Sequence, residues 1–323
     1  MAAITCKELD KSFSGREVLK RLSLDVPEGV IVGLLGSSGA GKTTFARILC
    51  GLETPDRGSV TFSGPARVML IPQDFTIWPE LTVEANVALG HRGAKAQRNE
   101  LVSSWLHKLG LHDLNSRYAG ELSYGQQQRV AVARAFCFQP AVMVLDEPFA
   151  HLDARARSSA SKEIADICRG ESITTVWITH DAREAFSVAE RLAVMDNGVI
   201  AQFDAPELVY RRPISRTVAL LTGDMNLFEA RDWNEFLTIC EEPDRHVKVE
   251  RDQVIGLRPE DIEILPGNST AAIRFVGCTF LGRGYYHQIR LRSGLITNIF
   301  HPTVLLPDGM YRIKINGEPC VFR

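Results

Sequence analysis

The stretch "GSSGAGKTT", residues 36–44, places closely spaced glycines before a lysine and two threonines. It matches G-x-x-x-x-G-K-[ST], in which the backbone curls so that consecutive N–H groups face a phosphate. Lys42 would then reach the β- and γ-phosphates, and Thr43 would offer its hydroxyl to Mg²⁺. The alternative is a glycine-rich turn with a solvated lysine. The stretch predicts a nucleotide-binding loop made by Gly36, Ser37, Ser38, Gly39, Ala40, Gly41, Lys42, Thr43 and Thr44.

Two carboxylates and a histidine lie further along the chain. Asp146 and Glu147 follow the apolar run "VMVL", and His180 ends the run "TTVWITH". Adjacent side chains on a strand point in different directions, so Asp146 is expected to hold Mg²⁺ and Glu147 to polarise a water for attack on the γ-phosphate. His180 is expected to contact the γ-phosphate and hold Glu147 in place. The alternatives are two helix-capping acids and a structural histidine.

Apolar runs bounded by glycine predict the strands that position these residues, at 30–36, 141–148 and 172–180. Each run precedes a segment with helical character, which predicts an α/β fold with a mostly parallel sheet. Between the first two runs, the spacing of Leu101 and Trp105 indicates a helical subdomain at about residues 75–140.

The pattern changes after about residue 221. His287, Ile289 and Leu291 alternate with polar residues, as in half-buried strands, and turn signals follow at 293–294 and 307–309. We therefore expect an α/β nucleotide-binding domain at 1–222 and a small all-β, barrel-like domain at 223–323.

Composition excludes some classes of protein. The formal net charge is −2 in 323 residues, which argues against nucleic acid or an anionic membrane surface as the main partner. The seven cysteines are scattered and contain no C-x-x-C, which fits reduced thiols in a cytosolic compartment. The N-terminus has no apolar core of signal-peptide length, and no run approaches the ~20 apolar residues that span a bilayer. The chain is expected to be soluble.

The order of motifs, with the P-loop followed by "LSYGQ", "VLDEP" and "THD", resembles the ATPase subunits of ATP-binding-cassette (ABC) transporters over about the first 220 residues. The resemblance implies that the chain binds and hydrolyses ATP with Mg²⁺. It also implies that Gln73 contacts Mg²⁺ or the attacking water, that Asp153 lies at a dimer interface, and that Phe13 stacks on adenine.

In that family, "LSYGQ" would act in trans, since two subunits pack head to tail and each completes the ATP site of the other. Ser123 would supply a hydroxyl and Gly125 a close backbone approach, while the helix beginning near Gln126 would offer unpaired N–H groups and about half a positive charge. Tyr124 departs from the family's glycine. If its φ were positive, tyrosine would cost ~1–2 kcal/mol.

The stretch "VIGLRPEDIEIL", residues 254–265, is similar to the accessory domain called TOBE in importer ATPases. The resemblance implies a peripheral subunit on the cytoplasmic face of the inner (plasma) membrane. Its partners would be separate permease subunits and, indirectly, an extracytoplasmic solute-binding protein. The solute would be ferric iron, a polyamine, phosphonate or sulfate. Phe75, Ile77 and Trp78 would contact the permease, the alternative being ordinary packing of the helical insert. The accessory domain could carry regulation, or a solute or anion site made by Arg283, Arg290 or Arg292, the alternative for these arginines being a solvated strand face.

Two rival functions stay open at this point. One is a soluble ABC ATPase that acts mechanically on nucleic acid or ribosomes, and the other is a P-loop kinase. The first usually carries two cassettes or a long coiled-coil insertion, which this sequence does not show, and the order of motifs argues against the second.

Overall fold

The computed structural model describes residues 2–64, 67–74, 76–91, 93–240, 247, 250, 253–267, 275–305 and 311–322. Phe75 and the turn expected at 307–309 therefore lie outside the described residues. The chain divides into two compact units, Met1–Glu207 and Leu208–Arg323.

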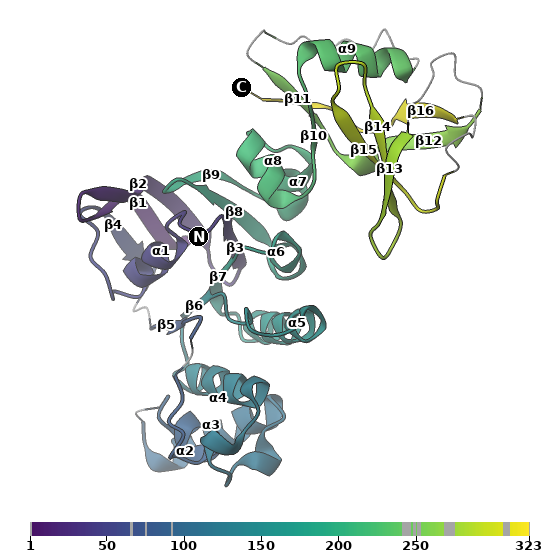
Figure 1. Ribbon diagram of the computed structural model, residues 1–323. Coiled ribbons are helices and arrows are strands. Elements are labelled where there is room, and N and C mark those ends of the chain that lie inside the picture. The colour runs from purple at the N-terminus through teal and green to yellow at the C-terminus, as the bar shows by residue number, and fades with distance from the viewer. Residues whose placement is uncertain are drawn as a thin grey trace. The chain divides into compact units, whose positions relative to one another are not determined.

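In the described part of the first unit, the central element is a six-stranded sheet (Figure 1). Its strands pair in the order β5 (Val68–Ile71), β6 (Val142–Asp146), β7 (Thr174–Thr179), β3 (Ile31–Gly36), β8 (Arg191–Asp196) and β9 (Val199–Asp204). All neighbours are parallel except β8 and β9, which form an antiparallel hairpin. The predicted α/β fold with a mostly parallel sheet is confirmed.

The inner strands β6, β7 and β3 are buried along their whole length, and because successive side chains point to opposite sides, both of their faces are covered. Met143 and Leu145 of β6 belong to one apolar core, whereas Val142 and Val144 belong to a second. The first core includes residues of α4 (Tyr124–Cys137) and α5 (Ala154–Gly170). The second includes α1 (Lys42–Leu49) and an antiparallel sheet formed by β1 (Ala2–Phe13), β2 (Arg16–Pro27) and β4 (Arg57–Phe62). The catalytic candidates at the ends of β3, β6 and β7 therefore stand on a rigid support.

The segment between β5 and β6 is helical, as predicted. It contains α2 (Val83–Ala88), α3 (Lys95–Lys108), α4 and two 3₁₀ turns at His112–Leu114 and Ala119–Glu121. Trp105 of α3 stacks on Phe136 of α4, with ring centroids 4.6 Å apart. This contact fastens the two longer helices to each other.

The second unit contains three small antiparallel sheets among its described residues. Their strands are β10 (Asn226–Phe228), β11 (Val254–Leu257) and β17 (Cys320–Phe322), then β12 (Ile262–Pro266) and β16 (Tyr311–Ile315), then β13 (Phe275–Phe280), β14 (Tyr285–Arg290) and β15 (Ile296–His301). His287, Ile289 and Leu291 are buried, as their alternation predicts. A helix that the sequence reading did not anticipate, α9 (Ala230–Ile239), adds Trp233 and Phe236 to the core.

The buried Arg258 side chain holds two short helices, α7 (Pro206–Arg211) and α8 (Arg216–Thr222), to the β-rich part of this second unit. Arg258 is 4% exposed, and its guanidinium donates hydrogen bonds of 2.9–3.0 Å to four acceptors in or beside these helices. These acceptors are the carbonyls of Tyr210, Ala219 and Asp224 and the hydroxyl of Thr222. The sequence predicts a domain boundary after residue 222, which lies within this second unit. The two compact units of the structure instead meet between Glu207 and Leu208, inside α7.

Candidate nucleotide-binding site

The P-loop curls between β3 and α1 in a form that requires glycine. Gly41 is the N-cap of α1 and has a φ of 106°, and a Cβ at this position would lie 3.0 Å from the carbonyl oxygen of Val18. Side chains avoid such positive φ values, and the close approach of the β2 backbone leaves no room for one. The loop therefore presents its backbone to an open cavity of about 900 Å³.

This cavity joins the P-loop to two hairpins. It is lined by Gly15, Arg16, Glu17, Val18, Lys20, Ser38, Gly39, Gly41, Lys42, Thr43, Thr44, Glu147 and Asn197. The residues from Gly15 to Lys20 come from the turn and first residues of β2, and Asn197 comes from the β8–β9 turn. Sequence reasoning missed both groups. The pair Asn197-Gly198 is a hairpin turn signal, but nothing local to it shows that the turn reaches the P-loop.

Lys42 is 7% exposed and is held by the loop itself. Its Nζ donates to the carbonyl oxygens of Gly36 at 2.8 Å and Ser37 at 2.9 Å. Burial lowers the pKa of this ammonium, and the charges of Glu147 and Asp146 partly offset that shift. The positive charge thus stands beside the two carboxylates, at the edge of the cavity.

Asp146 ends β6 and is also 7% exposed. Burial raises the pKa of its carboxyl, while a hydrogen bond from the hydroxyl of Thr43 acts in the opposite direction. The structure therefore brings together the carboxylate and the hydroxyl that the sequence predicts as Mg²⁺ ligands. The carboxylate of Asp146 and the hydroxyl of Thr43 both offer oxygen atoms as ligands, and oxygen is the ligand atom that Mg²⁺ prefers.

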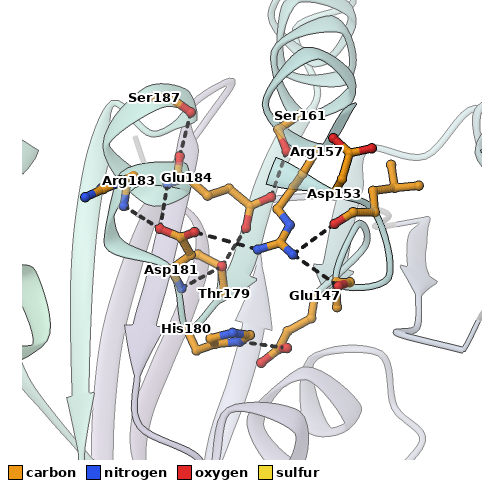
Figure 2. A network of polar contacts seen from close by, with 12 residues as sticks. Glu147, Asp153, Arg157, Ser161, Thr179, His180, Asp181, Arg183, Glu184 and Ser187 are labelled. Carbon is orange, nitrogen blue, oxygen red and sulfur yellow. Dashed lines mark hydrogen bonds and ion pairs between the residues drawn. The ribbon is translucent and has the colours of Figure 1, made fainter. Parts of the chain in front are cut away.

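Glu147 and His180 form a pair across β6 and β7 (Figure 2). His180 Nδ1 lies 2.9 Å from Glu147 Oε2, and because a carboxylate only accepts hydrogen bonds, Nδ1 carries the proton. Glu147 has a φ of 48°, an unfavourable value for a side-chain-bearing residue. Such strain persists only where the surroundings impose it, and here it directs the Glu147 side chain to the cavity and to His180.

The "LSYGQ" residues begin α4. Ser123 is its N-cap, and it forms a capping box with Gln126: Gln126 N donates to Ser123 Oγ at 3.4 Å, and Ser123 N donates to Gln126 Oε1 at 3.0 Å. Tyr124 opens the helix and is not among the residues with positive φ, so tyrosine carries no left-handed strain there. A Cβ built on Gly125 would meet no atom within 4 Å. These residues do not line the described part of the P-loop cavity.

The other predicted site residues are not gathered at the cavity. Gln73 is exposed, and Phe13 is 44% exposed with the Lys11 ammonium 5.2 Å from its ring centroid. Asp153 caps α5, accepting from the backbone N–H groups of Arg155 and Ala156 at 3.0 and 2.9 Å. In the second unit, Arg283 lies 5.4 Å from the Phe300 ring centroid, while Arg290 and Arg292 are exposed.

Comparisons with known proteins agree with this site. Residues 19–150 match the family model described as "ABC transporter". The chain is 36% identical over 303 residues to the Fe(3+) ions import ATP-binding protein FbpC of Pseudomonas fluorescens, covering 87% of this chain and 85% of that protein. It is 37% identical over 286 residues to the spermidine/putrescine import ATP-binding protein PotA of Lawsonia intracellularis, covering 81% and 77%. The solved structure of cbiO1 from Clostridium perfringens, part of the ABC transporter complex cbiONQ, aligns with a TM-score of 0.60 at 25% identity, covering 64% of this chain and 90% of that one.

The chain therefore belongs to the ABC transporter family, as an ATP-binding subunit of the importer type, and it is an ATP hydrolase. This confirms the family predicted from the order of the motifs. No helix in the described residues is long and apolar enough to cross a bilayer.

Proposed function

We propose that two copies of this chain close head to tail around two ATP molecules, and that hydrolysis separates them to drive import. The observation that carries this proposal is the position of the "LSYGQ" residues. They form a capped helix start with an open glycine, yet they do not line the described P-loop cavity of their own chain. A helix N-terminus favours phosphate, so a second copy would supply the ATP that it contacts.

Within each cavity, the P-loop N–H groups and Lys42 would bind the phosphates. Glu147 would accept a proton from the attacking water, and His180 would hold Glu147 in place beside the γ-phosphate through the 2.9 Å contact. Thr43 and Asp146 fit Mg²⁺, with Gln73 approaching when the subunits close, and this ion would neutralise the developing phosphate charge. Phe13, beside the cavity-lining turn, would contact adenine, and Asp153 would lie at the dimer interface.

The substitution Glu147→Gln tests the catalytic assignment. It keeps the shape of the side chain but removes the base, which is typically worth ~10²–10⁴-fold in rate. We expect ATP binding to stay within a few-fold of wild type by equilibrium titration while steady-state phosphate release falls by at least ~100-fold. Turnover equal to wild type would refute the role of Glu147. The exposed Glu171→Gln, at the end of α5, serves as the matched control.

The permease would dock at the helical segment. A cavity of about 220 Å³ is lined there by residues that include Trp78, Leu89 and Arg134. Trp78 is 41% and Leu89 50% exposed, and the Arg134 guanidinium lies 4.7 Å from the Trp78 ring centroid. Ile77, by contrast, packs against the apolar core. An exposed aromatic beside a cation suits a helix of a membrane subunit, which would place the chain at the cytoplasmic face of the inner membrane.

The cargo would be a small polar solute that an external binding protein delivers. Ferric iron, polyamine, phosphonate and sulfate are our candidates, because the two relatives named above, for iron and for polyamines, are 36% and 37% identical to this chain and so do not separate the first two. The second unit would be a TOBE-like accessory domain. Uptake of each labelled solute by cells with and without the gene, complemented by wild type or by Glu147→Gln, identifies the cargo. Retention of all uptake without the gene, or rescue by Glu147→Gln, would contradict the importer assignment.

A further inference from the structure

The loop at residues 148–153 joins Glu147 to α5, and one arginine holds its backbone. Arg157 lies in the first turn of α5, and its guanidinium turns back across the start of the helix. Its Nη2 donates to the carbonyl oxygens of Ala150 at 3.2 Å and Leu152 at 3.1 Å. The planar guanidinium bonds both loop carbonyls through one nitrogen and leaves its second terminal nitrogen to face Asp181, and the single nitrogen of a lysine cannot reproduce this fixed two-nitrogen geometry.

The same guanidinium reaches the segment that carries His180. Arg157 Nη1 lies 3.7 Å from Asp181 Oδ2, as Figure 2 shows. The Asp181 backbone N–H donates to the hydroxyl of Thr179 at 3.0 Å, and Asp181 Oδ1 accepts from the backbone N–H of Arg183 at 2.8 Å. Asp181 therefore has a fixed position, and Arg157 links that position to the loop.

Buried hydrogen bonds make the support under His180 rigid. The Glu184 carboxylate accepts from the hydroxyl of Thr179 at 2.5 Å and from that of Ser161 at 2.7 Å. Thr179 is 2% and Ser161 0% exposed. These bonds join α5, β7 and α6 (Ala182–Val188), so the residues on either side of His180 have little freedom.

We propose that Arg157 is a positioning residue for ATP hydrolysis. By holding Ala150 and Leu152 against Asp181, it fixes the loop after Glu147 relative to His180, and so sets the Glu147–His180 contact. The inference rests on the hydrolytic roles proposed above for these two residues. Arg157 does not line the described part of the cavity, so its effect on the rate passes through the residues that it holds.

The test compares Arg157→Lys with Arg155→Lys, both in the first turn of α5 and both keeping the charge. Arg155 is exposed, whereas Arg157 is partly buried at its carbonyl acceptors. Because small misplacements of catalytic groups are costly, we expect Arg157→Lys to lower kcat by about 10- to 100-fold with the KM for ATP within about twofold. Arg155→Lys should match wild type. Equal kcat values for Arg157→Lys and wild type would overturn the proposal, and thermal unfolding checks that both variants fold.

A double-mutant cycle separates positioning from a general structural effect. If Arg157 acts through Asp181, the variant carrying both Arg157→Lys and Asp181→Asn is no slower than the slower single variant. Rate losses that multiply would show independent roles and reject the proposal. Glu147→Gln and His180→Ala test the proposed function separately. If both turn over at the wild-type rate, that function fails, whereas if they are slow and Arg157→Lys is normal, only the inference on Arg157 fails.

Discussion

At the scale of single residues, the nucleotide site costs the folded chain stability. Asp146 and Lys42 are each 7% exposed, and burial disfavours the charged form of both, raising the pKa of the first and lowering that of the second. Such groups are retained for what they bind. The sequence predicted both residues as parts of a nucleotide site, because the spacing of a P-loop and the end of a buried strand are local features. It did not identify Arg157, whose partners are set by the fold.

We predict that Asp146→Asn makes the nucleotide-free chain as stable as wild type or more stable, by up to about 1 kcal/mol. Asparagine keeps an oxygen acceptor for the Thr43 hydroxyl and removes a buried charge. The same variant should lose the Mg²⁺-dependent part of the stabilisation by ATP. Differential scanning calorimetry with ATP, with and without Mg²⁺, measures both effects. Asp25→Asn, at an exposed position of β2, is the control that should keep Mg²⁺ dependence.

The pH dependence of this effect has a defined sign. The Asp146 carboxyl has a pKa of 3.8 in the unfolded chain and a higher pKa in the folded chain. At pH values between the unfolded and the folded pKa, the folded state therefore binds more protons than the unfolded state. The stability contributed by this group therefore falls as the pH rises through that window, and the cost is constant above it. The advantage of Asp146→Asn should be absent well below pH 3.8 and should grow as the pH rises through this window. An advantage that shrinks as the pH rises would contradict the burial argument.

At the scale of elements, patterns predicted the strands and the helical segment, but not the links between elements. Alternation placed His287 and Ile289 in the core correctly. The helix α9 was not predicted, although Trp233, Phe236 and Leu237 have helical spacing and are buried, because the helix is short and lies among strand patterns. The role of Arg258 could not be predicted, since its four acceptors lie 34–48 residues earlier in the chain.

We predict that Arg258→Met destabilises the second unit by roughly 2–4 kcal/mol, because it leaves carbonyls of α7 and α8 without their donor. Burial lowers the pKa of Arg258, which means that burying its charge costs free energy. Arg258→Met removes this cost, and the gain offsets part of the loss of hydrogen bonds. In urea unfolding followed by tryptophan fluorescence, the transition to which Trp233 contributes should shift to lower denaturant, while steady-state ATP hydrolysis by the first unit changes little. Arg290→Met, on the exposed side of β14, should unfold like wild type. Equal midpoints for the two variants would show that Arg258 does not hold the helices.

At the scale of the whole molecule, one chain presents two half-sites that it does not combine in the described cavity. In the P-loop half, Lys42 and Glu147 line one cavity, and the charge of Asp146 acts on both of them. The other half, from Ser123 to Gln126, is ordered by its capping box and contains a glycine that no packing among the described residues explains. The sequence predicted both halves from their motifs. It could not show how they meet, because in the proposed arrangement each half meets its counterpart in a second copy of the chain.

A substitution at Gly125 gives the sharpest test of that arrangement, because it should stabilise the monomer and weaken the proposed dimer. In the monomer a Cβ meets nothing within 4 Å, so Gly125→Ala should stabilise α4 by about 0.5–1 kcal/mol. In the dimer, the added methyl group would stand where the backbone must approach the γ-phosphate of the partner's ATP. Sedimentation velocity of Glu147→Gln with ATP and Mg²⁺ should show a dimer, and adding Gly125→Ala should weaken it at least about tenfold.

Tyr124→Gly, one residue earlier, should leave the dimer intact and change turnover only modestly, since Tyr124 is unstrained. A dimer unaffected by Gly125→Ala, in a chain that is more stable as a monomer, would mean that this helix start does not contact ATP in trans.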